Sequence, residues 1–129
     1  MTRTIRLFLL IEGATYAVAS LVHRGALVAG YAHRQAAVAE SVIAVVLLAG
    51  LVLGWLVPAW TRLAGLAAQT FALLATLLGL FMIAIGIGPR TVPDVIYHIA
   101  IVAVLAWGLV VAGRFPTAAE LDEGAEIGS

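Results

Sequence analysis

The sequence predicts an all-α integral membrane protein, an up-down-up-down bundle of four helices. Hydrophobic residues make up 64% of the 129-residue chain and charged residues 11%, against roughly 45–50% and about 25% in an ordinary soluble domain. So short a soluble chain cannot bury that much apolar surface. Four apolar segments instead reach the length of about 20 residues that a helix needs to cross a bilayer. No alternating strand pattern is present, and short connections make neighbouring helices antiparallel.

The first two spans are predicted over residues 3–23 and 35–56. Two arginines precede the first apolar run, as they do in a signal peptide, but the run continues past Glu12 without an Ala-x-Ala cleavage pattern. We therefore interpret it as a span. The second ends at "WLVPAW", where two tryptophans bracket Pro58 as aromatic anchors at the membrane–water interface. Within it, the Gly50-x-x-x-Gly54 pattern predicts close contact with another helix.

The third and fourth spans are predicted over residues 61–85 and 93–113. Glycines and two prolines in "GIGPRTVPD" break the chain between them, and Pro93 suits the first turn of the fourth helix, where its missing N–H costs nothing. Residues 1–113 therefore form one four-helix domain. Residues 114–129 contain four acids and are expected to form a solvated, mostly disordered tail.

Composition narrows the function classes and the location. The net charge is zero and no basic run suggests nucleic acid, while the absence of cysteine excludes thiolate chemistry. All seven basic residues are arginine, which hints at a GC-rich bacterial genome and hence at a bacterial inner membrane. The positive-inside rule slightly favours a cytoplasmic N-terminus, because four arginines lie on that side and three on the other, namely Arg3, Arg6, Arg62 and Arg114 against Arg24, Arg34 and Arg90.

Ionisable residues inside the spans indicate a candidate site. Glu40 and His98 each lie five residues into helices that enter from the same side, so both should sit roughly 8 Å deep at one level. We expect them to form the floor of a ligand-binding site in the outer half of the bundle. Asp94 lies one helical turn from His98 and could orient it. The remaining members of this candidate site are His23 and His33 at its mouth and Tyr97 beside His98.

Several chemistries fit this candidate site. Imidazole and carboxylate ligands suit a transition metal, held by His98, Glu40, His23 and His33. Haem b could be bound between His98 and a histidine of the first helix. A quinone or another lipophilic small molecule could hydrogen-bond to His98 and Glu40. Structural readings compete, with Glu40 and His98 as a buried pair joining two helices, Asp94 as a helix-capping acid and the other histidines at the interface. We favour a binding or accessory protein, with the ligand left open, in a homo-oligomer or a larger complex.

A second polar pair is predicted in the other half of the bundle. Glu12 lies six residues after Arg6 and Gln69 seven after Arg62, so the two should meet at similar depth. The chain length, the four spans and a lone glutamate in "LIEGATYA" are similar to small multidrug resistance transporters. That resemblance implies a homodimeric proton-coupled transporter in which Glu12 titrates. Gln69, placed by its depth, and Tyr16, one helical turn from Glu12, would belong to the same site. The third span departs from the family pattern because it has no tryptophan.

Two further possibilities complete the sequence-based interpretation. The overall hydropathy is also similar to the DoxX-like group of small bacterial membrane proteins, which implies the same four-helix architecture. A purely structural subunit of a larger membrane complex would need no chemistry of its own, and the buried polar residues would then serve to hold helices together.

Overall fold

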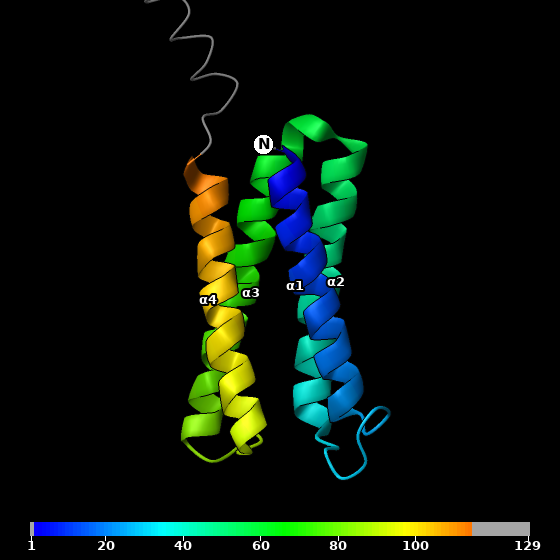
Figure 1. Ribbon diagram of the computed structural model, residues 1–129, viewed down its shortest axis with the longest axis vertical. Helices are drawn as coiled ribbons and strands as arrows, with labels where there is room; N and C mark the ends of the chain where they lie inside the picture. The colour runs from blue at the N-terminus through cyan, green and yellow to red at the C-terminus, as the bar shows by residue number, and fades with distance from the viewer. Residues whose placement is uncertain (1, 115–129) are drawn as a thin grey trace, which may run out of the picture.

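A computed structural model describes residues 2–114 and is built from four long helices, with no strand in that range (Figure 1). Their bounds are α1 Thr2–His23, α2 Arg34–Leu56, α3 Thr61–Ala84 and α4 Val92–Arg114, and a 3-10 turn, η1, covers Pro58–Trp60. Each helix begins and ends within one residue of its predicted span, so the all-α prediction is confirmed. The predicted tail lies outside the described residues apart from Arg114, which ends α4.

The chain folds as two helical hairpins, α1 with α2 and α3 with α4, which pack together mainly through α2 and α3. Both hairpin loops lie at one end of the bundle, called here the loop end. The N-terminus, η1 and the end of α4 lie at the opposite, N-terminal end (Figure 1). The hairpins lie closer together at the N-terminal end than at the loop end, where the functional side chains described below are found.

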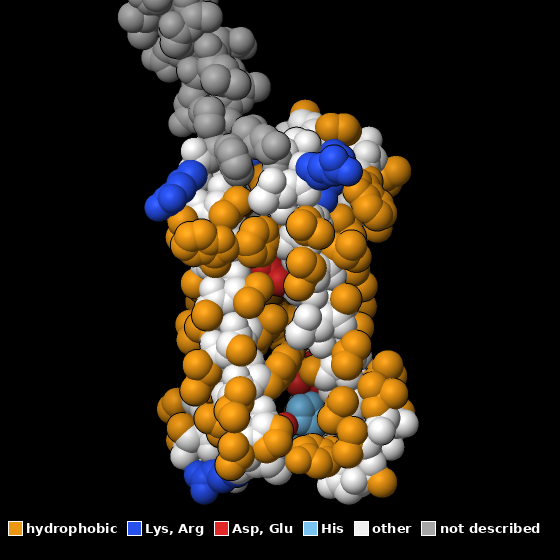
Figure 2. Space-filling model, viewed as in Figure 1, with side chains coloured by type: hydrophobic (Ala, Val, Ile, Leu, Met, Phe, Trp, Pro, Cys, Tyr) orange, Lys and Arg blue, Asp and Glu red, His pale blue; other side chains and the backbone are white. Residues whose placement is uncertain are grey.

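All four helices are long and apolar enough to cross a membrane. Large hydrophobic side chains cover the middle of the visible surface, and arginines lie towards its two ends (Figure 2). Exposed leucines, valines and isoleucines occur on every helix, as in Leu7, Val45, Leu74 and Ile99. Water would oppose such a surface whereas acyl chains accept it, so the chain has the features of a multi-pass membrane protein.

Small residues let the helices approach closely. A Cβ added at Gly50 would lie 3.1 Å from the Cβ of Ala68 on α3, which confirms the predicted close contact there. At Gly54 the backbone carbonyl accepts hydrogen bonds from Arg6 at 2.7 Å and from Thr61 at 3.0 Å. Arg6 and Thr61 therefore lock α1, α2 and the start of α3 together at the N-terminal end.

Two local backbone features, a glycine turn after α3 and a capping box before α4, shape the loop end. Gly86 adopts φ +91° after α3, a left-handed conformation that glycine adopts without strain, and the Arg90 side chain donates to the carbonyls of Ile83 and Ala84 at the end of that helix. Asp94 and Thr91 then form a capping box at the start of α4, each receiving a hydrogen bond from the other's backbone N–H. Pro93 lies in this first turn, as predicted.

Candidate functional site

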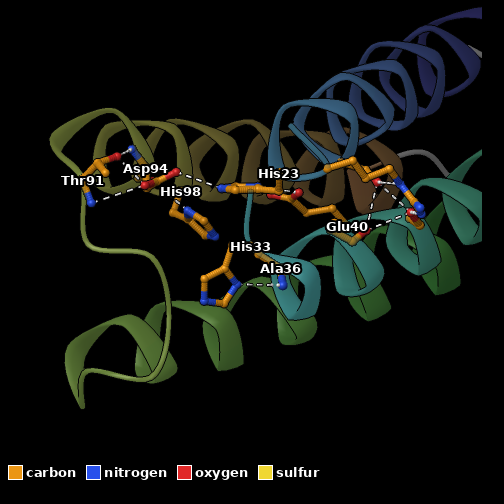
Figure 3. A network of polar contacts seen from close by, with 11 residues as sticks. His23, His33, Ala36, Glu40, Thr91, Asp94 and His98 are labelled. Carbon is orange, nitrogen blue, oxygen red and sulfur yellow. Dashed lines mark hydrogen bonds and ion pairs between the residues drawn. The ribbon is translucent and has the colours of Figure 1, made fainter. Parts of the chain in front are cut away.

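A buried histidine at the loop end joins two carboxylates from two other helices (Figure 3). His23, the last residue of α1, lies with Nδ1 2.8 Å from Glu40 Oε2 on α2 and with Nε2 3.0 Å from Asp94 Oδ1 on α4. These three residues are called the His23 triad. His23 is 3% exposed and Glu40 4% exposed, so both are within the protein interior. The triad therefore connects the two helical hairpins.

The hydrogen bonds of the triad set the number of protons that they need. An unprotonated imidazole nitrogen and a carboxylate oxygen both accept, so each of the two contacts needs a proton between its atoms. With those two protons and no third, one imidazole and two carboxylates carry one negative charge, whichever atoms hold the protons. Asp94 has further partners, because its Oδ2 accepts from the Thr91 hydroxyl and from the Thr91 N–H. Glu40 Oε1, by contrast, is buried and has no hydrogen-bond partner.

The observed triad differs in three details from the arrangement that the sequence predicts. His23 was expected at the mouth of the site and instead lies at the centre of the network. The residue that hydrogen-bonds Glu40 is His23 and not His98. Asp94 does orient His98, but through its backbone carbonyl, because its carboxylate is bonded to His23 and Thr91. The position of a residue along its helix could not predict these partners, because it gives the depth of the residue in the membrane and not the direction in which its side chain points.

His98 presents one ring nitrogen to an open space. Its Nδ1 lies 2.7 Å from the backbone carbonyl of Asp94, and a carbonyl only accepts, so Nδ1 carries the hydrogen. The neutral ring then has its lone pair on Nε2. This nitrogen faces Gly79 of α3, where an added Cβ would lie 3.7 Å away. Tyr97 packs its ring against His98 edge to face, with the ring centres 5.2 Å apart.

The space in front of His98 is a cavity of about 460 Å³, called here the α2–α3 cavity because those helices supply most of its wall. Glu40 and His98, which were expected to share a site, both line it. The other polar residues in its lining are Tyr16, His33, Gln35 and Thr76. Apolar side chains form the remainder, among them Val42, Ile43, Phe71, Leu78 and Met82. Cavities of this size and composition are typical of small-molecule sites.

A second hollow lies on the other side of the triad, between α1 and α4. It is lined by His23, Asp94 and Tyr97 together with Tyr31 and small or apolar residues of α1. Figure 2 shows a histidine with carboxylates on both sides of it in the gap between these two helices. The Tyr97 hydroxyl is buried without a hydrogen-bond partner. The triad therefore separates two hollows and contributes side chains to both.

The predicted metal and haem ligands do not come together as a coordination site. Both ring nitrogens of His23 are hydrogen-bonded to carboxylates, so neither is free to bind iron or another metal. His33 lines the α2–α3 cavity, but its Nδ1 accepts from the Ala36 N–H and caps α2. Within residues 2–114 no group of three or more histidine, aspartate or glutamate side chains is arranged to hold a metal ion. The four predicted metal ligands are therefore not gathered into one coordination group in the described part of the chain.

Glu12 and Gln69 form the polar pair predicted for the other half of the bundle. The Gln69 amide nitrogen donates to both carboxylate oxygens of Glu12, at 3.0 and 3.1 Å. Both side chains are fully buried, and neither lines the two hollows described above. A Cβ added at Gly108 would lie 2.1 Å from the Gln69 amide nitrogen, so glycine leaves the space that the pair occupies. Proton-coupled transport through Glu12 stays a prediction.

Sequence reasoning missed Thr76 and Thr91. Thr76 donates to the Ala72 carbonyl at 2.6 Å and hydrogen-bonds the Tyr16 hydroxyl, and Tyr16 is buried. Thr91 is paired with Asp94 at the start of α4. The Thr-x-x-Asp spacing of a capping box was a visible signal for Thr91. No local pattern marks Thr76, because its role depends on a residue of α1.

Comparison of the chain with protein-family models, with curated proteins and with solved structures finds no match. The function proposed below therefore rests on the geometry of the site.

Proposed function

We propose that this protein binds a lipophilic small molecule in the α2–α3 cavity and acts as a membrane-embedded binding or accessory protein. The observation that carries the proposal is the combination of an apolar wall with two acceptor atoms, Glu40 Oε1 and His98 Nε2. The first is enclosed by protein atoms without a partner, and the second is the unengaged nitrogen of a ring that lines the cavity. Buried polar atoms are normally hydrogen-bonded, and a bound molecule with a polar group would supply the missing partner.

The rim of the cavity supports entry from the bilayer. Several of its lining side chains are also exposed on the outside of the bundle, including Val42, Phe71, Leu78 and Ile87. In a membrane these positions would contact acyl chains, so an apolar molecule dissolved in the bilayer could reach the cavity between α2 and α3. The volume of about 460 Å³ accommodates a molecule of the size usual for such pockets.

We also propose a bacterial inner membrane as the location, with the N-terminus on the cytoplasmic side. The exclusive use of arginine and the four-to-three arginine balance support this assignment. A homo-oligomer or a place in a larger membrane complex is part of the same proposal. It is supported by the many large apolar side chains on the outer surface of a bundle this small.

The test is a search for a molecule that purifies with the protein. Native mass spectrometry of the protein, released from mild detergent, should show one low-mass apolar molecule per chain. The His98→Ala variant should lose it. The Gln69→Ala variant should retain it, because Gln69 is an equally inward-facing polar residue that does not line the cavity.

A cavity-filling variant gives a second test. Gly79→Leu places a side chain in front of His98 and should also lose the molecule. Gly113→Leu is its matched control, because nothing lies within 4 Å of a Cβ added there. Retention of the molecule by both His98→Ala and Gly79→Leu would contradict the proposed site.

A further inference from the structure

We propose, building on the binding function above, that the α2–α3 cavity selects a lipophilic ammonium. Such a molecule has an apolar body and a protonated amine, and the amine would lie between Glu40 Oε1 and His98 Nε2. Two independent properties of the cavity lead to this class of ligand: the charge beside it and the kind of hydrogen-bonding atoms left free in it.

The charge argument begins with the His23 triad. With only the two protons that its hydrogen bonds need, the triad carries one negative charge, and Glu40, one of its two carboxylates, lines the cavity. No arginine lines the cavity. The nearest candidate along the chain, Arg24, directs its donors to the hydroxyls of Ser20 and Ser41 rather than to a carboxylate of the triad. A cation in the cavity would therefore balance a buried charge, and its attraction is stronger in an apolar interior than in water.

The hydrogen-bond argument concerns the polar atoms deep in the cavity. Thr76 uses its hydrogen on the Ala72 carbonyl, so the Tyr16 hydroxyl must donate to Thr76. These two hydroxyl hydrogens are thus already engaged. The atoms still free there are acceptors, Glu40 Oε1 and His98 Nε2. An ammonium has several N–H donors and no acceptor, so it complements both atoms at once.

Other polar groups fit less well. A carboxylate would add a second negative charge beside the triad and would offer no donor to either acceptor. An alcohol has one hydrogen to donate and leaves the charge of the triad unbalanced. His33 and Gln35, at the start of α2, also line the cavity.

The test compares three twelve-carbon amphiphiles that differ only in the polar group: dodecylamine, dodecanol and dodecanoate. Native mass spectrometry of the unaltered protein counts one-to-one adducts as each amphiphile is titrated near neutral pH. Dodecylamine should bind at least about tenfold more tightly than dodecanol, because a hydrogen bond in which both donor and acceptor are charged is stronger than one from a neutral hydroxyl. Dodecanoate should bind most weakly. Equal binding of amine and alcohol would show that a proton already neutralises the triad and would overturn the proposal.

Two matched variants locate the selectivity. Glu40→Gln removes the carboxylate with little change in size and should abolish the preference for the amine. Glu12→Gln makes the same change at a buried carboxylate that does not line the cavity, and should keep the preference. A preference that survives Glu40→Gln, or that disappears in Glu12→Gln, would contradict the assignment of the amine to Glu40.

The design also separates this inference from the proposed function. If Gly79→Leu blocks all three amphiphiles but the amine is not preferred, the cavity binds lipophilic molecules and only the ammonium inference fails. If none of the three forms a saturable adduct that Gly79→Leu removes, the proposed function fails as well.

Discussion

The two halves of this bundle each bury a glutamate, and the surroundings of the two differ. In the N-terminal half Glu12 is fully buried, both of its oxygens accept hydrogen bonds from Gln69, and Gly108 packs against the pair. In the loop-end half Glu40 shares a histidine with Asp94, keeps one oxygen without a partner and borders a cavity. A carboxylate inside a membrane span is thus not by itself a sign of function. Both sites contain a buried acceptor without a partner, Glu40 Oε1 in one and Gln69 Oε1 in the other, so it is the cavity beside Glu40 that distinguishes the two.

The comparison also shows two ways of joining helices through buried polar side chains. The Glu12–Gln69 pair connects α1 to α3 with one amide group and lines neither of the two hollows. The His23 triad connects α1, α2 and α4 through a single ring, at the end of the bundle where the hairpins are further apart (Figures 1 and 3). The wider separation at that end leaves hollows on both sides of the ring.

The largest expected effect comes from removing the centre of the triad. His23→Leu leaves Glu40 and Asp94 buried without the imidazole that bridges them, and breaking a buried charged network by removing one partner typically costs about 3–5 kcal/mol. The free energy of unfolding, measured by reversible denaturation in mixed micelles, should fall by that amount.

His33→Leu provides the control for this prediction. His33 makes one capping hydrogen bond to Ala36, so its loss should cost only about 1 kcal/mol. Equal destabilisation by the two leucine variants would show that His23 is not the centre of a network and that the two halves of the bundle differ less than described here.

A smaller effect should follow from closing the space around the other pair. Gly108→Ala places a methyl group where the Gln69 amide and a Glu12 oxygen lie, at 2.1 and 2.8 Å. Overpacking of this kind costs about 1–3 kcal/mol. Gly113→Ala, in the same helix and with open space around its Cβ, should be neutral or slightly stabilising because alanine favours helix. A thermal-unfolding series in detergent compares them, and equal melting temperatures would refute the packing argument.

The smallest expected effect concerns the support of the triad. Thr91→Ala removes the hydroxyl that bonds the second oxygen of Asp94 and opens the capping box of α4. Loss of such a cap costs about 1 kcal/mol. Hydrogen exchange should quicken in the first turn of α4, while the Glu12–Gln69 half stays protected. Uniform quickening along all four helices would mean that the two halves do not respond separately.

Much of the architecture could be predicted because the bilayer leaves few options. Span length, proline and glycine breaks, and the need to satisfy every backbone group internally predict four helices with bounds correct to within one residue. The Glu12–Gln69 contact could also be predicted, since two residues at equal depth inside a small bundle have few other polar partners.

The partners of the loop-end site could not be predicted in the same way. Counting residues along each helix placed Glu40, His98, Asp94 and His23 in one half of the bundle, and all four are found there. It paired Glu40 with His98, however, because rise per residue measures height and is insensitive to rotation about the helix axis. His23, at the last turn of α1, was assumed to face the headgroups, whereas its side chain is buried and turned towards Glu40 of α2 and Asp94 of α4.

The sequence alone therefore determined the fold class, the limits of the helices and the depth of each polar residue, because hydropathy and helical rise are properties of the chain itself. Only the tertiary structure decided that His23 bridges two carboxylates, that His98 turns its free nitrogen to a cavity and that Glu12 is fully buried. The physical reason is that hydrogen-bond partners and empty space depend on how helices rotate and separate when they pack, and those quantities belong to pairs of helices rather than to any one segment.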